Sequence, residues 1–185
     1  MVLGDAYLQA TGKKNARIRL EHSIKQKEYL MWKADQFPKL FSGKPKTMKR
    51  YNAKFGKSYE YIRWQSNSSP VIGKLRQKFY REDSGRKIPS DIKKILITPV
   101  ALAVWFMDDG YYYALDKMAY IYLPNMSEKD FDLLLEALKV NFDLFPKLKR
   151  KKHGWCLSFG VGETAKLIEI VSPHICESML YKVTT

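Results

Sequence analysis

The strongest structural signal in this chain is the sequence Ala101-Leu102-Ala103-Val104-Trp105-Phe106-Met107-Asp108-Asp109-Gly110. It predicts a short, almost wholly apolar helix that ends in two adjacent carboxylates and a glycine. Thr98 and Pro99 precede it, and they are residue types favoured at the N-cap and at the first position of a helix. Gly110 is the residue type that commonly stops a helix.

The carboxylates of Asp108 and Asp109 would lie at the negative end of the helix dipole. That placement costs about 0.3–1 kcal/mol per charge. A divalent cation held by oxygen ligands would offset this cost. Two solvated aspartates at the end of a buried helix would bear this cost without a metal ion. The residues of this stretch therefore leave both interpretations open, a metal site and an ordinary solvated helix end.

A second copy of the motif stands at the start of the chain. Val2-Leu3-Gly4-Asp5-Ala6-Tyr7 aligns with Phe106-Met107-Asp108-Asp109-Gly110-Tyr111, and Asp5 and Asp109 take equivalent positions. The repetition predicts two similar halves, each opening with the same element. A pair of carboxylates at the ends of two packed helices is what a phosphodiesterase site with metal ions needs.

The composition favours an anionic partner. The chain has 185 residues, and 33 Lys and Arg against 19 Asp and Glu give a net charge of +14. Nucleic acid is the leading partner, with an anionic membrane surface as the competing interpretation. No segment approaches the ~18–20 apolar residues of a membrane span. The N-terminus does not have the pattern of a signal peptide, so we expect an intracellular protein.

Cysteine and histidine give no sign of a zinc or disulfide framework. Cys156 and Cys176 are not in a CxxC arrangement, and we expect both to be reduced packing residues. The three histidines lack the spacing of a zinc site.

The pattern between the two motifs predicts one strand, one hairpin and two helices before a polar linker. The strand covers 16–23 and exposes Arg17, Arg19 and Glu21 on one face. A helix follows over 25–41, with Pro38 expected to bend or end it. The remaining segments are a basic hairpin over 46–64, a helix over 70–80 and the linker over 81–87.

After the second motif the order of elements repeats. The helix over 127–142 should begin at Ser127, with Asp130 at its third position. The other segments are a hairpin over 111–123, a basic hairpin over 146–161 that turns at His153 and Gly154, a helix over 164–171 and a last short helix over 173–181.

Cations gather on the predicted hairpins, which favours contact with DNA over an ordinary solvated face. A β-ribbon fits the major groove, where Arg or Lys can pair with guanine and Gln with adenine, while other cations touch only phosphate. The candidate DNA-binding residues are Arg17, Arg19, Lys46, Lys49, Arg50, Lys54, Arg63, Gln65, Lys147, Lys149, Arg150, Lys151 and Lys152.

The two motifs resemble the paired LAGLIDADG elements of single-chain homing endonucleases. Further matches are Lys87-Ile88-Pro89 between the repeats, Leu96-Ile97-Thr98-Pro99 before the second motif and Met179-Leu180-Tyr181-Lys182 near the end of the chain. The resemblance therefore covers essentially the whole sequence.

The resemblance implies an α+β fold of two tandem αββαββα repeats. Their two antiparallel sheets would form a pseudo-twofold saddle, with the motif helices packed at the centre. The first repeat would cover residues 1–88 and the second 89–185. The family's first motif helix extends further upstream of Gly4 than Met1-Val2-Leu3, so we expect a shortened helix and less packing against 102–106.

The resemblance also implies a function. Members of the family are site-specific endonucleases that cut both strands of a long, asymmetric DNA target, and this chain would do so as a monomer encoded in a mobile intron or intein. Asp5 and Asp109 would bind Mg²⁺, with the carbonyls of Gly4 and Asp108 as further ligands. Mn²⁺ can substitute, and Ca²⁺ is expected to support binding without cleavage.

The family places one basic residue near the metal ions in each repeat. In the second repeat this position matches Lys182. In the first repeat it matches Arg86, with Lys87 beside it as the alternative. Arginine is a departure, because it holds its proton more tightly than lysine.

Two other functions remain open at this level. One is a non-cleaving nucleic-acid binder on the same fold, either an intron RNA maturase or a DNA-binding regulator, with intron RNA as a further partner. The other is a membrane-surface protein, which would carry its cations on an amphipathic helix. Here the cations fall on predicted strands.

Overall fold

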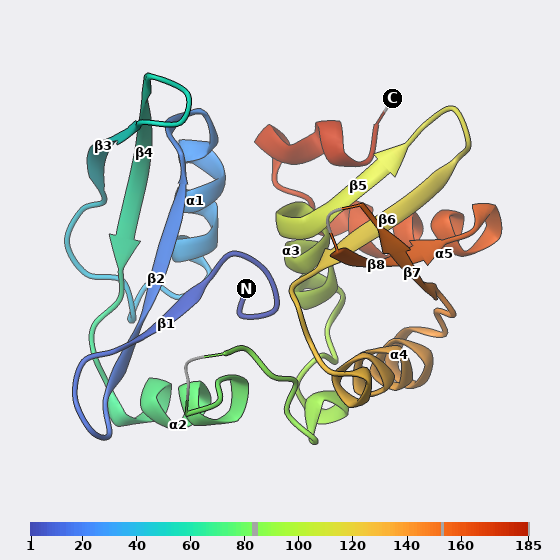
Figure 1. Cartoon of the computed structure of the whole chain (residues 1–185), viewed down its shortest axis with the longest axis horizontal. Helices are drawn as coiled ribbons and strands as arrows, with labels where there is room; N and C mark the ends of the chain where they lie inside the picture. Colours follow the sequence, from blue (N-terminus) through green and yellow to red (C-terminus); the bar gives the residue numbers. More distant parts are fainter. Residues whose placement is uncertain (83–84, 153, 185) are drawn as a thin grey trace. The chain divides into compact units, whose positions relative to one another are not determined.

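The computed structural model describes residues 1–82, 85–152 and 154–184. Its internal contacts divide the chain into two compact units. The first unit comprises Val2 and Gly4–Arg76, and the second comprises Met1, Leu3 and the chain from Gln77 onward. Each unit contains one antiparallel sheet of four strands (Figure 1). The predicted α+β class with two antiparallel sheets is therefore confirmed.

The first unit is built on the strand order β1-β2-β4-β3. The expected shortened motif helix is wrong: Val2 to Asp5 form a turn, and within the described residues no helix stands before β1. A short 3-10 segment, η1 (Ile24–Gln26), precedes α1. The last residues of α2, from Gln77 onward, belong to the second unit. The strands and helices are β1 (Tyr7–Ala10), β2 (Ala16–Ser23), α1 (Lys27–Asp35), β3 (Lys46–Asn52), β4 (Lys57–Gln65) and α2 (Pro70–Phe79).

Alternating side chains give the first sheet a buried and an open face. In β2, Ile18, Leu20 and His22 are buried, while Arg17, Arg19 and Glu21 are partly exposed, which confirms the predicted strand with a charged face. Helix α1 packs against β2 and β4 on the buried side (Figure 1).

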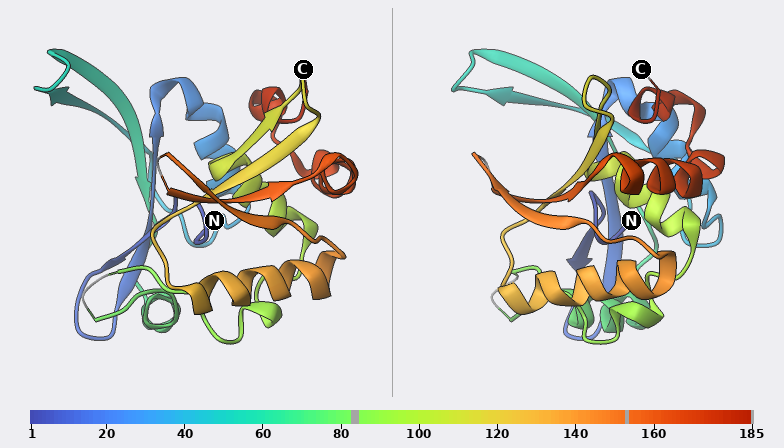
Figure 2. Two further views of the ribbon diagram at one scale, coloured as in Figure 1. Left: turned by 45° about the vertical axis from the view of Figure 1, so that its right-hand side comes forward. Right: turned by 90° about the vertical axis from the view of Figure 1, so that its right-hand side faces the viewer.

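Two features of this unit depart from the simplest pattern. Helix α1 ends at Asp35, earlier than predicted, and the chain tightens where the Phe37 N–H donates to Ala34 O. Pro38 explains the early end, because its ring and missing N–H prevent the helix from continuing. Strands β3 and β4 pair beyond the end of β2 and project as a two-stranded ribbon (Figure 2).

The second unit has the order αββαββα and the strand order β5-β6-β8-β7. Helices α3 and α5 pack on the sheet, α3 against β5 and β6 and α5 against β6 and β8. The elements are η2 (Ile92–Lys94), α3 (Pro99–Asp109), β5 (Gly110–Tyr113), β6 (Met118–Leu123), α4 (Glu128–Phe142), β7 (Lys147–Lys151), β8 (Gly154–Phe159), α5 (Val161–Val171), η3 (Ser172–His174) and η4 (Glu177–Lys182).

Three predicted segments of the second unit differ from the prediction or include residues outside the described ranges. The predicted last helix is two 3-10 segments, because Ile175 and Cys176 adopt extended backbone between them. In the predicted turn at His153 and Gly154, His153 lies outside the described residues and Gly154 opens β8. The predicted linker includes residues 83–84, which also lie outside them.

Helix α4 begins with the predicted cap. The Ser127 hydroxyl accepts from the Asp130 N–H, and the Asp130 carboxylate accepts from the Ser127 N–H. The same carboxylate accepts from the Ile88 N–H at 2.8 Å and from Arg81 at 3.0 Å. Burial alone would raise the pKa of Asp130, but the bonds from Ser127, Ile88 and Arg81 outweigh it and lower the pKa below its ordinary value.

Among the described residues, no helix has the length and apolar character needed to cross a membrane.

Candidate active site and nucleic-acid interface

The second motif is helix α3 and the first residue of the strand that follows it. The Thr98 side chain caps the helix by accepting from the Ala101 N–H, and Pro99 takes the first position, as predicted. Residues 102–107 are all buried. This buried apolar body fixes the helix, and the last two residues, Asp108 and Asp109, are partly exposed at its C-terminal end.

Gly110 ends α3 as predicted, but for a different physical reason. Its backbone is extended, with φ −81° and ψ 153°, so no left-handed conformation is involved. A Cβ at this position would lie 2.3 Å from Phe106 O and 2.4 Å from Phe106 Cδ2. Glycine is required here by the close approach of Phe106, and Asp109 therefore adjoins β5 directly.

The second motif opens into a pocket of about 400 Å³, lined by Asp108, Asp109, Gly110, Tyr111, Tyr122 and Lys182. The Lys182 ammonium donates to Gly110 O at 2.7 Å. The structure thus brings three predicted site residues, Asp108, Asp109 and Lys182, to one pocket. Carboxylate oxygens are the donors that Mg²⁺ prefers, so the donor set fits a hard divalent cation.

The first motif lies in the turn before β1. Gly4 is buried, and the side chain of Asp5 is 44% exposed. His22 Nδ1 lies 3.8 Å from Asp5 Oδ2, and the His22 side chain is only 3% exposed. His22 was not among the predicted site residues. The available signal was a histidine at an inward-facing position of a half-buried strand, in line with Ile18 and Leu20.

Behind His22 stand two buried residues of α1. The ring centroids of His22 and Tyr29 are 5.2 Å apart. Lys33 Nζ lies 4.4 Å from the centroid of Tyr29, and both side chains are fully buried. A buried ammonium over an aromatic ring is a cation–π contact, so the Tyr29 ring contacts both the Lys33 ammonium and the His22 imidazole.

The two predicted basic candidates of the first repeat make different contacts. Arg86 Nη1 donates to the backbone oxygen of Leu3, a residue of the first motif, at 3.3 Å. Lys87 contributes its backbone N–H, which donates to Phe79 O at 3.0 Å.

The open face of the first sheet carries most of the cations predicted for it. Opposite residues in antiparallel strands share a face, and the register pairs Arg19 with Gln65, Glu21 with Arg63, and Arg63 with Lys46. We call this surface the first open face. It includes Tyr7, Gln9, Arg17, Arg19, Glu21, Lys46, Arg50, Tyr61, Arg63 and Gln65.

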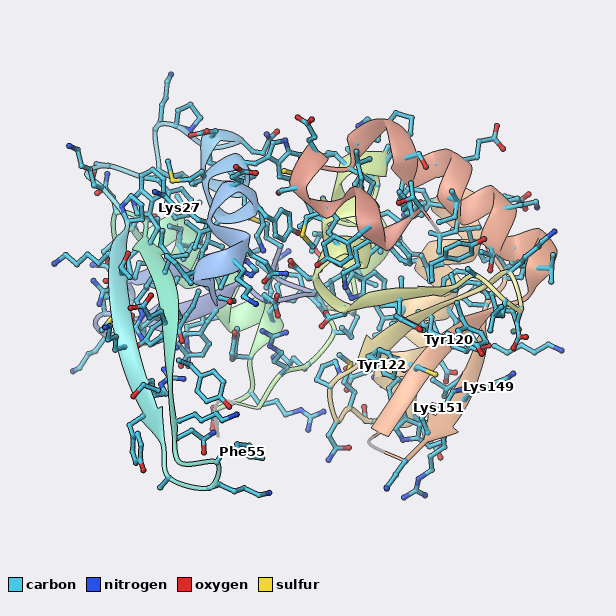
Figure 3. The ribbon with its side chains drawn as sticks, turned by 90° about the horizontal axis from the view of Figure 1, so that it is seen from above. Lys27, Phe55, Tyr120, Tyr122, Lys149 and Lys151 are labelled. Carbon is cyan, nitrogen blue, oxygen red and sulfur yellow. The ribbon has the colours of Figure 1, made fainter. Side chains whose placement is uncertain are left out.

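Two predicted residues of the same hairpin lie elsewhere. Lys49 stands opposite Glu60 on the other face of the sheet, and their Nζ and Oε1 atoms are 3.1 Å apart. Lys54 lies in the turn between β3 and β4, with Nζ 5.7 Å from the ring centroid of Phe55, which Figure 3 labels at the tip of the ribbon. Both stay predictions as DNA contacts.

The open face of the second sheet is formed by lysine and tyrosine. The register places Lys147, Lys149 and Lys151 on the same face as Tyr111, Tyr113, Tyr120 and Tyr122, and we call this surface the second open face. Lys151 Nζ lies 4.4 Å from the ring centroid of Tyr120. In Figure 3 Lys149, Lys151, Tyr120 and Tyr122 gather over the neighbouring strands.

The other predicted cations of this hairpin do not share that face. Arg150 points to the opposite face, where its guanidinium lies 5.9 Å from the ring centroid of Trp155. Lys152 follows β7 and is exposed.

Both cysteines are free and buried, as expected. Cys156 stands opposite Lys149 in the register, so it is on the same side of the sheet as the second open face, although its side chain is buried. Burial raises the pKa of its thiol, and the charges of Lys151 and Lys149 oppose the rise.

Comparison with known proteins supports the family resemblance. The model of the LAGLIDADG DNA endonuclease family matches residues 1–167. The chain is 29% identical over 178 residues to protein RecA of Mycolicibacterium fallax, covering 90% of this chain and 40% of that protein. It is 24% identical over 186 residues to the probable intron-encoded endonuclease 1 of Wickerhamomyces canadensis, covering 98% of this chain and 79% of that protein.

Among solved structures, the fold is similar to that of the homing endonuclease I-WcaI bound to its DNA recognition sequence. The TM-score is 0.86 at 23% identity, over 99% of this chain and 82% of that chain. The chain spans only 40–44% of the length of the mycobacterial RecA proteins that it matches.

Proposed function

We propose that this chain, which belongs to the LAGLIDADG DNA endonuclease family, is a site-specific endonuclease that cuts both strands of DNA as a monomer. The observation that carries the proposal is the pocket of the second motif, which holds two carboxylates and an ammonium group. These are the groups that phosphodiester hydrolysis uses to bind a metal ion and to stabilise charge on the phosphate.

Asp5 and Asp109 are proposed to hold Mg²⁺, with the carbonyls of Gly4 and Asp108 as further ligands. The fit rests on the hard oxygen donors of Asp108 and Asp109 in one pocket. When bound, a divalent cation polarises the phosphate and lowers the pKa of its bound water. Mn²⁺ is expected to substitute for Mg²⁺, and Ca²⁺ to support DNA binding without cleavage.

Lys182 is the proposed basic residue of the second repeat. Its bond to Gly110 O holds the ammonium beside the residue that follows Asp109. From there it can stabilise negative charge that develops on a phosphate, since ammonium groups act most strongly in a partly desolvated pocket. Arg86 takes the same role in the first repeat, because its guanidinium contacts the backbone of Leu3. Lys87 stays the alternative.

DNA is proposed to bind on the first and second open faces. Their cations belong to a chain of net charge +14. Binding through phosphates releases condensed counterions, so the logarithm of affinity should fall linearly with the logarithm of salt, with a slope of about −0.9 per phosphate neutralised. Affinity that does not change between low and physiological salt would contradict this mode of binding.

The deciding experiment is cleavage of supercoiled plasmids that carry a randomised target library. The full chain is incubated in Mg²⁺ and, separately, in Ca²⁺. The test variant is Asp5→Asn/Asp109→Asn, and the matched control is Asp116→Asn/Asp132→Asn, which removes the same charge at two exposed positions. We expect linear product in Mg²⁺ from the parent and the control only, with recovered ends that define the target.

Salt-sensitive binding without cleavage by the parent protein would overturn the endonuclease proposal. It would favour a maturase or a DNA-binding regulator on the same fold. Equal cleavage by the test variant would instead exclude Asp5 and Asp109 as the metal ligands.

A further inference from the structure

The two open faces carry different chemistry, although they belong to repeats of the same architecture. On the first open face the cations include Arg17, Arg19, Arg50 and Arg63. On the second they are Lys147, Lys149 and Lys151. Arginine presents a rigid fork of donors that can pair with the two acceptors of guanine, whereas the lysine ammonium is a flexible point charge.

The arginines of the first open face are held in place by a carboxylate. Arg63 Nε donates to Glu21 Oε2 at 2.7 Å, and Arg63 Nη2 forms an ion pair with the same oxygen at 2.7 Å. Arg50 Nη2 donates to Glu21 Oε1 at 3.2 Å. The guanidinium carbons of Arg50 and Arg63 lie 4.8 and 5.6 Å from the ring centroid of Tyr61. A guanidinium has five N–H donors, so Glu21 fixes each fork without using all of them.

A second polar cluster lies at the other edge of the same face. Gln9 Oε1 accepts from Arg17 Nε and from Gln65 Nε2, both at 3.1 Å. Arg19 stacks on Tyr7, with its guanidinium carbon 4.8 Å from the ring centroid. Gln9 was not among the predicted DNA contacts, but its position between Arg17 and Gln65 makes it part of the same network. Groups ordered before binding lose less side-chain entropy on contact with DNA.

The second open face has no such network. The described strands β5, β6, β7 and β8 contain no aspartate or glutamate that could orient a cation. The one arginine of these strands, Arg150, points to the other face and lies near Trp155. What remains is a layer of ammonium groups over tyrosine rings, which can neutralise phosphates at many sequences.

We propose that sequence readout is divided unequally between the repeats. The first open face reads base edges, chiefly through Arg63 and Arg50 oriented by Glu21, and the second open face holds its half of the target through phosphates. This inference rests on the proposed function, because it takes the open faces as the DNA-binding surfaces.

The test begins with selection of bound sequences from a randomised duplex library by the full chain in Ca²⁺. Base preferences are then measured position by position for the parent and three variants. Arg63→Lys keeps the charge but removes the fork. We expect discrimination at one or two positions to fall about 5- to 150-fold, which corresponds to the worth of one bidentate pair, with an unchanged salt slope. Those positions identify the half of the target that the first face reads.

Glu21→Gln separates orientation from affinity. It removes a negative charge from the binding face, so total affinity should rise, while discrimination at the same positions should fall because the arginines are no longer fixed. A merely structural role of Glu21 would lower both quantities. The matched variant for the second face is Lys149→Gln/Lys151→Gln, which should reduce the salt slope by about two phosphate contacts and leave base preferences unchanged.

Three outcomes would overturn the inference. Base preferences of equal strength in both halves would contradict unequal readout, and so would a change in base preference in the Lys149→Gln/Lys151→Gln variant. A library from which no sequence is enriched would contradict both this inference and the proposed function. The first two outcomes contradict this inference alone, so the two failures can be told apart.

Discussion

His22 Nδ1 lies 3.8 Å from the carboxylate of Asp5, and the imidazole is held almost completely buried on β2. The buried imidazole therefore lies beside a proposed metal ligand that sits in the turn before β1, and we expect it to orient that ligand. Residues that orient metal ligands are typically worth about 10- to 100-fold in metal affinity or activity.

We therefore expect His22→Ala to lower Mg²⁺-dependent cleavage about 10- to 100-fold. Affinity for DNA in Ca²⁺ should change far less, because His22 lies away from the open face. The measurement is a Mg²⁺ titration of single-turnover cleavage beside an anisotropy titration with DNA. His174→Ala serves as the control histidine. If cleavage and DNA affinity fall together with thermal stability, His22 is a packing residue only.

Asp109→Asn should abolish cleavage, with a loss of at least about 100-fold, and leave DNA binding intact or slightly tighter. The amide keeps the shape of the side chain but removes the negative charge that a metal ion would need. Gel-shift titrations give the DNA affinity, and cleavage of the same labelled duplex gives the cleavage rate. A parallel loss of binding and cleavage would show that Asp109 supports the fold of the pocket instead.

Gly73→Ala should destabilise the first unit. A Cβ at this position of α2 would lie 1.9 Å from Lys14 O and 2.8 Å from the Lys14 carbonyl carbon. These are backbone atoms that cannot rotate away, so we expect a loss of about 1–3 kcal/mol. Urea denaturation measures it.

The matched control is Gly162→Ala in α5, where nothing lies within 4 Å of the added Cβ. This change should be neutral or stabilise the helix by up to about 1 kcal/mol. Equal destabilisation by the two substitutions would mean that the contact with Lys14 is not what requires a glycine.

Asp130 should make the stability of the second unit sensitive to acid. Its pKa is lowered in the folded state, because bonds from Ser127, Ile88 and Arg81 outweigh the effect of burial. A group whose pKa is lower in the folded state than in the unfolded state stabilises the folded protein. This contribution is fully present at pH values above the unfolded pKa, about 3.9 for aspartate, and it is lost as the pH falls through the pKa of the folded state.

Asp130→Asn should cost about 1–3 kcal/mol at neutral pH, because the Arg81 guanidinium loses its ionised acceptor and the cap of α4 is altered. The free energy of unfolding of the variant should also fall less steeply below pH 4 than that of the parent. The measurement is urea denaturation at a series of pH values. Identical pH dependence in the two proteins would show that Asp130 does not carry this linkage.

Local features were predictable wherever one stretch of sequence determines them. The caps of α3 and α4 depend on residues within one turn of the helix, and Thr98, Pro99 and Ser127 all took their predicted positions. The alternation of β2 was clear because one face of that strand is buried. In β3 no residue is fully buried, so hydrophobic periodicity could not show which of the neighbours Lys49 and Arg50 lies on the open face.

The site itself depends on contacts that sequence spacing does not encode. Lys182 reaches Gly110 across 72 positions and Arg86 reaches Leu3 across 83. Only the family resemblance indicated these two basic residues. The approach of His22 to Asp5 depends on the register between β1 and β2 and on the turn before β1, and neither follows from hydrophobic pattern alone.

The junction between α3 and β5 has no connecting residue, because Asp109 is the last residue of the helix and Gly110 the first of the strand. One residue inserted there would shift the sequence of β5 by one position relative to the end of α3. Side chains alternate along a strand, so Tyr111 and Tyr113 would exchange faces with Tyr112. Length variation should therefore be absent at this junction among active relatives and accepted in the exposed turn at 114–117, where added residues leave the pairing of β5 with β6 unchanged.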